Sequence, residues 1–266
     1  MNATASTRQG RRGTITAYII AYNEIDKIEG AIRSVLWADE VIVIDSHSTD
    51  GTTELAEALG AKVFHVAFEG YGPLRNAALN FCTTDWILSL DADERCTPEV
   101  ENEIYELLSR GSSTTDYYFV PRKNFFLGRW IRYSGWYPNY RQPQLFKRGS
   151  LTYDTLPVHE GYVVHTQKPP GYLRNAILQF PFKDVGEVLR KADKYSALGA
   201  ARLRGRSITV WTAFLHGAWS FLKHYVFKLG CLDGGPGLII AVGNFEGTFY
   251  RYLRAMEIQN READGR

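Results

Sequence analysis

The chain has 266 residues, which is near the upper limit for a single hydrophobic core, so one large α/β domain with an appended region fits better than two equal domains. Hydrophobic residues make up 45% and charged residues 23% of the chain, as is typical of a folded globular protein. The 31 basic and 29 acidic side chains give a net charge of +2, which excludes the strong overall positive field of a nucleic-acid-binding protein.

The first 13 residues are polar and basic and lack the apolar core of a signal peptide. We therefore expect a flexible tail and a protein that is not exported. The three cysteines, Cys82, Cys96 and Cys231, are widely spaced and form no CxxC motif, which argues against a disulfide framework or a zinc site. A reducing compartment is the simplest location for such a chain.

Residues 14–98 alternate short apolar runs with helical patterns. Strands are predicted at 14–21, 41–44, 61–66 and 86–90, and helices at 25–35, 52–59 and 74–81. Continuous β-branched runs are typical of strands buried on both faces, and their alternation with helices indicates right-handed βαβ units. We therefore predict a doubly wound, parallel sheet in this half, followed by a helix at 99–109.

A polar segment, Ser48-Thr49-Asp50-Gly51-Thr52, precedes the second of these helices. Its hydroxyl and carboxylate side chains are able to cap the free backbone amides of the helix that follows. Gly60 is expected to end that helix.

The chain changes character after Ser112, where aromatic residues, Arg, Gly and Pro become frequent. Twisted strands and long loops are expected there, and such segments often carry substrate recognition. A basic helical pattern follows at 184–203, and the apolar stretches 208–227 and 245–256 are interrupted by Lys and His before they reach the length of a membrane span. Two interpretations of these stretches stay open: amphipathic helices at a membrane surface, or a helical hairpin that covers the sheet.

Polar side chains follow three of the predicted strands at the point where each strand ends. They are Tyr22-Asn23-Glu24, Asp45-Ser46 and Asp91-Ala92-Asp93. Ligands of open parallel sheets bind outside the carboxyl ends of the strands, so we expect these side chains to face one crevice.

The Asp-x-Asp spacing suits a divalent cation. In an extended segment, residues i and i+2 project to the same side, so Asp91 and Asp93 would face one ligand. Two carboxylates are hard oxygen donors that favour Mg²⁺ or Mn²⁺ over zinc, and such an ion can stabilise a diphosphate leaving group. The alternative, acids that cap the helix near Thr97, explains one acid and not three.

Two further residues have both a structural and a functional interpretation. Asp45 is either a turn or cap residue, or a contact to a base or ribose. Arg75, which follows a Gly-Tyr-Gly-Pro loop, either reaches a diphosphate or forms a surface salt bridge.

The sequence strongly resembles the family 2 glycosyltransferases with the GT-A fold. The resemblance rests on four segments: AYNE (21–24), VIVIDSHSTDGT (41–52), GYGPLRNAAL (70–79) and DWILSLDADE (85–94). Further segments resemble the branch of lipopolysaccharide-core β-glucosyltransferases: VPRKNFFLGRWIRYSGWYP (120–138), LFKR (145–148), VHE (158–160) and LGCLDGGPGL (229–238). Matching segments extend from about Thr14 to Met256.

This resemblance implies a mixed, mostly parallel GT-A sheet flanked by helices, with an appended C-terminal helical region. It implies a tail (1–13), a nucleotide-sugar-binding half (14–112), an acceptor-binding half of the same domain (113–182) and C-terminal amphipathic helices (183–266). The implied protein is cytoplasmic and peripheral on the inner face of the membrane.

The resemblance also implies roles for individual residues. Tyr22, Asn23 and Glu24 would line the nucleotide pocket, and Asp45 would contact the base. Arg75 and Asp91 would contact the nucleotide-sugar, and Asp93, together with Asp91, would hold Mg²⁺ or Mn²⁺. The expected reaction is an inverting displacement by an acceptor hydroxyl on a UDP-sugar, with Glu160 as the candidate base and His159 orienting it or the substrate; the expected acceptor is a lipopolysaccharide core or a lipid-linked glycan.

Two positions depart from the expected pattern. Gln179-Phe180 stands where a His-Tyr pair is expected, and Gln144 stands where the branch usually has Arg. Two other functions therefore stay open: a metal-dependent nucleotidyl or phosphoryl transferase, which the missing Walker loop disfavours, and an inactive nucleotide-binding module associated with membranes. Glu94 is expected only to cap the next helix.

Overall fold

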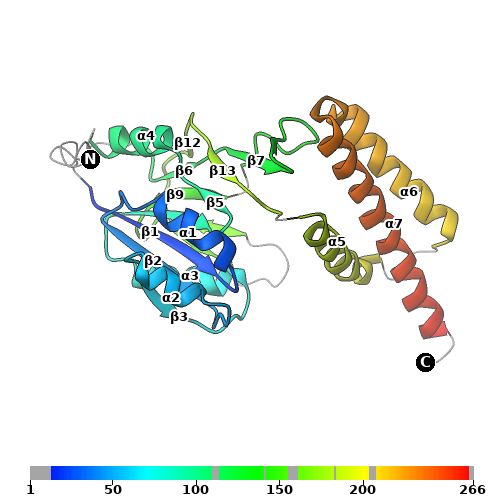
Figure 1. Cartoon of the computed structure of the whole chain (residues 1–266), viewed down its shortest axis with the longest axis horizontal. Coiled ribbons are helices and arrows are strands. Elements are labelled where there is room, and N and C mark those ends of the chain that lie inside the picture. The colour runs from blue at the N-terminus through cyan, green and yellow to red at the C-terminus, as the bar shows by residue number, and fades with distance from the viewer. Residues whose placement is uncertain are drawn as a thin grey trace. The chain divides into compact units, whose positions relative to one another are not determined.

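A computed structural model of the chain describes residues 13–109, 114–140, 142–154, 161–182, 184–203 and 208–263. The chain folds into two units. The first unit comprises Met1–Arg122 and Asn139–Gln179, and the second comprises Lys123–Pro138 and Phe180–Arg266. Figure 1 labels most of their helices and strands.

The first unit is built on a sheet with seven strands among the described residues, in the order β12-β6-β9-β4-β1-β2-β3 (Figure 1). Parallel pairs join β1 to both β2 and β4, and β2 to β3, whereas β9 runs antiparallel to β4 and β6. The strands are β1 (Ile15–Ala21), β2 (Glu40–Asp45), β3 (Lys62–His65), β4 (Trp86–Asp91), β6 (Tyr117–Phe119), β9 (Pro143–Lys147) and β12 (Gly171–Tyr172). The expectation of a mixed, mostly parallel sheet is confirmed.

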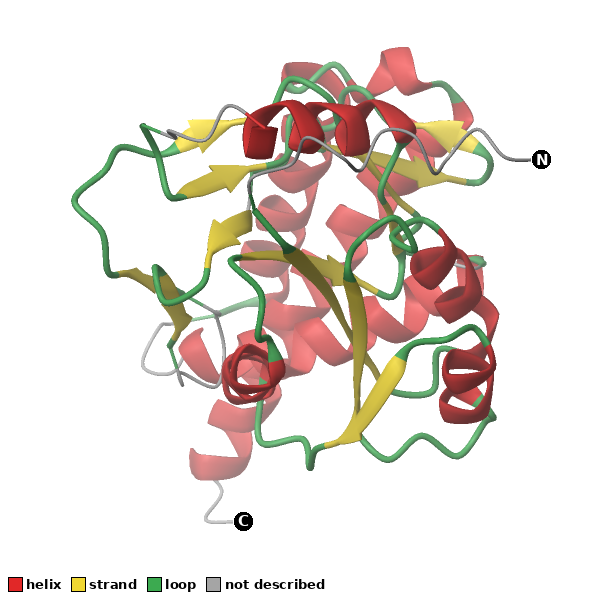
Figure 2. Cartoon of the chain, turned by 90° about the vertical axis from the view of Figure 1, so that its left-hand side faces the viewer, coloured by secondary structure: helices red, strands yellow, loops and turns green. Residues whose placement is uncertain are grey.

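Helices cover both faces of this sheet, and Figure 2 shows strands with helices on either side of them. One buried cluster joins Ile19 and Leu90 of the strands to Ile28 and Val100 of the helices, and a second cluster on the other face includes Leu74. Every residue of β1 is buried, because this strand lies between β2 and β4 and is covered on both faces. The helices are α1 (Ile25–Arg33), α2 (Thr52–Ala58), α3 (Tyr71–Phe81) and α4 (Pro98–Ser109).

Two short antiparallel pairs complete the first unit. The strand β5 (Glu94–Arg95) pairs with β13 (Ile177–Gln179), so that Gln179 lies opposite Glu94. The strand β10 (Leu151–Tyr153) pairs with β11 (Tyr162–Val164). The first pair extends the acidic end of β4, and the second flanks the segment 155–160.

The second unit contains a β-hairpin and the C-terminal helices. Its hairpin is formed by β7 (Arg122–Phe126), whose first residue belongs to the first unit, and β8 (Arg129–Trp130). Helix α7 packs against both α5 and α6. The helical segments are α5 (Val185–Ala200), η2 (Ala201–Leu203), α6 (Val210–Leu222), the π-helical η3 (Lys223–Phe227), η4 (Gly230–Asp233) and α7 (Gly235–Ala263).

The C-terminal helices confirm the expected helical region beyond the sheet. Over the described part of the chain, no helix combines the length and the apolar character needed to cross a bilayer.

Candidate functional site

The loops after β1 and β2 hold each other in place through side-chain caps. Ser48 Oγ accepts a hydrogen bond from the Asn23 amide at 2.8 Å, and Asn23 Oδ1 accepts one from the Thr49 amide at 2.9 Å. Thr52 Oγ1 accepts from the Glu24 amide at 2.9 Å. The polar segment after β2 therefore fixes the start of α1, a role that the sequence did not predict.

The predicted capping of α2 by the same segment is only partly correct. Asp50 Oδ1 accepts a hydrogen bond from the Thr52 amide at 3.1 Å, but Asp50 Oδ2 accepts one from the Ile25 amide, also at 3.1 Å. The residue at the N-cap position itself is Gly51, which has a φ of 93° and no side-chain cap. The segment thus serves two helices at once.

Asp45 lies at the end of β2 and is completely buried. Its carboxylate accepts hydrogen bonds from Ser48, at 2.8 Å from the amide and 2.5 Å from the hydroxyl. His65 Nδ1 lies 3.3 Å from Asp45 Oδ2, and the His65 ring stacks on His47 with 5.7 Å between the centroids. Asp45 therefore has a fixed orientation, whereas Tyr22, at the tip of β1, is largely exposed.

Arg75 and Asp91 form an ion pair at the end of β4. Arg75 projects from α3, is only 3% exposed, and donates from Nη2 to Asp91 Oδ1 at 2.6 Å and from Nη1 to Ser89 Oγ at 2.9 Å. Its guanidinium group lies 5.6 Å from the ring centre of Tyr153. The interpretation of Arg75 as a surface salt-bridge residue is therefore wrong, because its side chain is buried against the site.

Two buried tyrosines, Tyr18 and Tyr153, lie next to Arg75. The Tyr18 hydroxyl donates to the Tyr153 hydroxyl at 3.0 Å, and burial raises the pKa of both phenols. Asn76 bonds both backbone polar groups of Tyr153, each at 2.8 Å. The end of β10 is thereby fastened to α3 next to Arg75.

The acidic motif after β4 is a turn and not an extended segment, contrary to the assumption made from its spacing. The strand β4 ends at Asp91, Ala92 and Asp93 form the turn, and β5 begins at Glu94. Ala92 is buried in the core, and Gln179 Nε2 lies 3.3 Å from each carboxylate oxygen of Asp93. Gln179, one of the two departures from the expected pattern, thus contacts the residue predicted to bind metal.

The strand register places Asp45 and Asp91 on opposite faces of the sheet. Asp45 pairs with Ala21 of β1, and Asp91 pairs with Ile20. Paired residues of parallel strands share a face, and successive residues of one strand alternate between faces. Asp45 therefore leaves the sheet on the side of α1, and Asp91 leaves it on the side of α3, where Arg75 meets it.

Glu94 was expected to cap the next helix, but it does not. Its side chain is completely buried beneath the turn instead. Its Oε1 accepts from Arg122 Nε at 2.5 Å, and its Oε2 accepts from the Asp91 amide at 3.0 Å and from Gln144 Nε2 at 2.9 Å. Burial raises the pKa of Glu94 to about 7, with Arg122 acting in the opposite direction. The helix α4 is capped by Thr97 instead, whose hydroxyl accepts from the Val100 amide at 3.3 Å.

The donors at the turn fit a hard divalent cation that keeps other ligands. Asp91 and Asp93 supply carboxylate oxygens within one turn. Among the residues that the structure describes, no three or more His, Cys, Asp or Glu side chains gather into a complete metal cage. An ion at the turn would therefore take its remaining ligands from water and phosphate oxygens, as Mg²⁺ usually does.

The candidate base, Glu160, and its neighbour His159 lie outside the described residues. The chain on either side is closed into a hairpin, because the Asp154 amide donates to the Gly161 carbonyl at 3.1 Å and Tyr153 pairs with Tyr162. The described residues on either side of this segment thus lie near the Asn76–Tyr153 contact.

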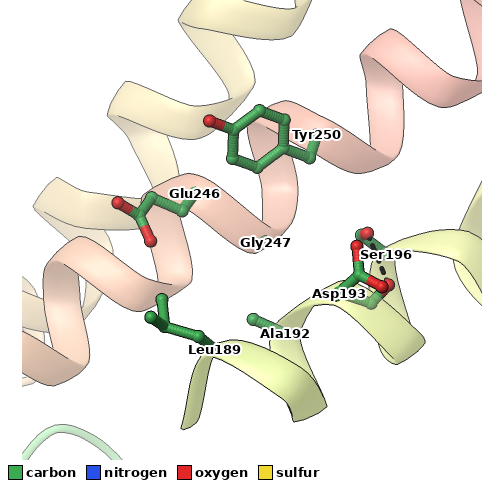
Figure 3. Close-up of a pocket in the computed structure, with 7 residues that line it drawn as sticks. All are labelled: Leu189, Ala192, Asp193, Ser196, Glu246, Gly247 and Tyr250. Carbon is green, nitrogen blue, oxygen red and sulfur yellow. Dashed lines mark hydrogen bonds between the residues drawn. The ribbon is translucent and has the colours of Figure 1, made fainter. Parts of the chain in front are cut away.

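A separate pocket lies between α5 and α7 in the second unit (Figure 3). Figure 3 shows Glu246 and Tyr250 of α7 and Leu189 and Asp193 of α5 around it. Asp193 is paired with Arg254, and its carbonyl accepts from Ser196 Oγ at 2.8 Å. Its lining offers no arrangement of groups comparable to the turn after β4.

Comparison with known proteins gives a match to the family model described as Glycosyl transferase family 2 over residues 16–162. An uncharacterized glycosyltransferase of Rickettsia bellii is 50% identical over 91 residues, which is 34% of this chain and 31% of that protein. The lipopolysaccharide core biosynthesis glycosyltransferase LpsC of Rhizobium meliloti is 29% identical over 266 residues, which cover 94% of this chain and 93% of LpsC. The chain thus spans about a third of the length of the Rickettsia bellii relative and most of LpsC.

Among solved structures, Staphylococcus aureus TarS 1–349 matches with a TM-score of 0.49 and 16% identity, over 95% of this chain and 92% of that chain.

Replacement of Arg122 by Met is expected to lower the free energy of unfolding by about 3 kcal/mol or more, because it leaves the buried Glu94 carboxylate without its cation. Urea denaturation followed by circular dichroism measures this loss. The matched control is Lys62→Met, which breaks the exposed Lys62–Glu40 pair and should cost less than about 1 kcal/mol. Equal losses in the two variants would contradict the prediction, and Glu94→Gln added to Arg122→Met should recover part of the loss.

Proposed function

Since the chain belongs to glycosyl transferase family 2, we propose that it is an inverting, metal-dependent glycosyltransferase that uses a UDP-sugar. The transferred sugar is glucose or a related hexose, and the acceptor is a lipopolysaccharide core or another lipid-linked glycan. The observation that carries this proposal is the acidic turn at the end of β4, where Asp91 is paired with the buried Arg75 and Asp93 lies next to it.

The nucleotide binds at the ends of β1 and β2. The Asp45 carboxylate is oriented by Ser48 and accepts a hydrogen bond from the base, for which the side chains that bury Asp45 move aside. A carboxylate is an acceptor only, and uracil offers one ring N–H as donor. Tyr22, Asn23 and Glu24 line the same pocket, in which the interlocked loops give Asn23 and Glu24 fixed backbone positions.

The diphosphate lies at the acidic turn. Asp93, with Asp91, would hold Mg²⁺ or Mn²⁺ there, and such an ion would supply positive charge to stabilise the departing diphosphate. Arg75 orients Asp91 through the 2.6 Å bond and adds positive charge where the leaving group departs. A guanidinium group that is already buried and bonded requires little reorganisation during the reaction.

The acceptor hydroxyl reacts on the opposite side of the sugar. Glu160 takes the hydroxyl proton while the acceptor oxygen forms a bond to the anomeric carbon. The bond from that carbon to the diphosphate oxygen breaks, and its electron pair leaves with UDP. His159 orients Glu160 or the acceptor.

The acceptor class is supported by the relation to LpsC, whose name assigns it to lipopolysaccharide core biosynthesis and which aligns over most of both chains. Acceptors of this class are attached to lipid, so we place the protein on the inner face of the cytoplasmic membrane, as a peripheral protein bound to an anionic surface. Gln144 contacts Glu94 beneath the acidic turn and Gln179 contacts Asp93, so both are candidates for differences in donor or acceptor specificity from related enzymes.

Replacement of Asp93 by Ala is expected to lower Mn²⁺-dependent release of UDP from UDP-sugars by about a hundredfold or more, because a metal ligand is removed. Turnover assays with and without Mn²⁺, and calorimetry with UDP, measure the effect. Asp85→Ala is the control, since Asp85 lies at the other end of β4 and bonds Thr14. Unchanged turnover and UDP affinity in Asp93→Ala would refute the assigned metal site.

Replacement of Glu160 by Gln should reduce transfer by about a hundredfold or more while UDP affinity stays unchanged, because a base contributes to the reaction and not to nucleotide binding. Steady-state kinetics and calorimetry separate the two effects. Glu69→Gln, at an exposed position of the first unit, is the control. Full activity in Glu160→Gln would assign the base elsewhere.

The acceptor is identified by mass spectrometry of lipopolysaccharide and lipid extracts from cells with the active protein and with the Asp93→Ala variant. We expect a glycan that is one hexose shorter in the variant. Identical glycans in the two strains, with UDP release intact in vitro, would reject the proposed acceptor but not the proposed transfer.

A further inference from the structure

Helix α6 of the second unit packs through its small residues and exposes its large ones. Ala213 and Gly217 are its buried positions, and a Cβ atom on Gly217 would lie 3.0 Å from the Phe245 ring of α7. On the outside, Trp211 is 75% exposed, Leu215 64% and Trp219 57%. A helix that packs against its neighbours in water normally buries its large apolar residues and exposes its polar ones.

The exposed residues form one continuous stripe. Trp211, Leu215 and Trp219 follow a spacing of four residues, which places them on the same face of the helix. Leu222 and Val226 continue the stripe into η3 and are about half exposed. We call these five residues the α6 face. Single exposed apolar residues are common, but a contiguous patch of this kind marks a binding surface.

The surroundings of the α6 face are basic. Residues 208–245 contain one acidic residue, Asp233, which is buried and accepts hydrogen bonds from the Arg132 amide at 3.0 Å and the Ser134 hydroxyl at 3.0 Å. Lys223 and Lys228 lie in or next to η3. No exposed acid therefore opposes an anionic partner along this segment.

The hairpin of the same unit adds further cations. Residues 123–138 contain Lys123, Arg129 and Arg132 and no acid. Arg129 Nη2 donates to the Leu232 carbonyl at 3.2 Å, and the Ser134 amide donates to the Lys228 carbonyl at 2.9 Å, so the hairpin lies beside the end of η3. The apolar stripe thus ends next to a cluster of positive charge.

We infer that the α6 face inserts into the headgroup region of an anionic bilayer, with Lys223, Lys228 and Arg129 at the lipid phosphates. This deepens the proposed function, since it rests on the proposed location at the membrane and assigns the surface that makes the contact. Tryptophan rings are favoured at the interface between headgroups and acyl chains, and basic residues are attracted to anionic lipids. A second copy of the chain or a protein partner would not require the absence of exposed acids.

Flotation of the full-length protein with vesicles of phosphatidylcholine, with and without phosphatidylglycerol, tests this inference. We expect strong binding to the anionic vesicles only. The triple variant Trp211→Ser, Leu215→Ser, Trp219→Ser should lower the partition coefficient by about tenfold for each side chain removed. Lys223→Glu with Lys228→Glu should abolish the preference for anionic lipid while the stripe stays intact.

A matched control removes three exposed apolar residues from the first unit, by Leu36→Ser, Phe68→Ser and Tyr172→Ser. It should bind vesicles like the parent chain. Quenching of tryptophan fluorescence by brominated phosphatidylglycerol gives a second readout: Trp211→Phe with Trp219→Phe should keep vesicle binding and lose most of the quenching. Melting curves of all variants show that they remain folded.

Three outcomes would overturn the inference: binding that the α6 variant leaves unchanged, equal loss in the first-unit control, or sedimentation that shows dimers through the α6 face and no vesicle binding. Release of UDP from a UDP-sugar with a water-soluble acceptor is measured in parallel. A parent chain that releases UDP but binds no anionic vesicles refutes docking alone, whereas a parent chain that binds vesicles but releases no UDP refutes the proposed transfer alone.

Discussion

The buried ion pair between Glu94 and Arg122 is the contact on which the acidic turn depends. Burial of a carboxylate costs several kcal/mol unless charges and hydrogen bonds compensate for the lost water. Glu94 has three donors: the Arg122 guanidinium, the Gln144 amide and the backbone amide of Asp91. They come from β7, β9 and β4, and β7 belongs to a different sheet from β9 and β4, so the position of the turn depends on residues of two sheets. Asp91 and Asp93 are displayed at its surface because Glu94 is fixed beneath it.

A second constraint acts on the neighbouring strand ends. The loops after β1 and β2 share hydrogen bonds in both directions, since Ser48 caps the Asn23 amide and Asn23 caps the Thr49 amide. A ligand at these loops meets groups whose conformational entropy has already been lost on folding. The Asp45 carboxylate is fixed in the same way by Ser48, on the face of the sheet opposite to Asp91. A nucleotide that contacts both aspartates must therefore extend across the carboxyl ends of β1, β2 and β4.

The sequence predicted what depends on local patterns and missed what depends on distant partners. The runs that became β1, β2 and β4 are recognisable because both faces of these strands are buried and apolar residues predominate in them. The role of Glu94 was missed because its partners, Arg122 and Gln144, are separated from it by 28 and 50 positions. The turn at Ala92-Asp93 was missed because the short strand β5 is defined only by its pairing with β13. A signal was present at Gln144 and Gln179, where the chain departs from the pattern that the resemblance led us to expect.

These two glutamines change the electrostatics of the turn. Gln144 contacts Glu94 and Gln179 contacts Asp93, each through a neutral amide. An arginine at 144 would bring a second guanidinium group to Glu94. In the part of the chain that the structure describes, Arg122 is the cation that pairs with Glu94, and burial raises the pKa of Glu94 to about 7. An amide also presents an oxygen when it rotates by half a turn, and N and O are then exchanged at the same distance. Gln179 is thus able either to donate a hydrogen bond to the Asp93 carboxylate or, after rotation of the amide, to present an oxygen ligand beside that carboxylate. A protonated histidine at this position could only donate.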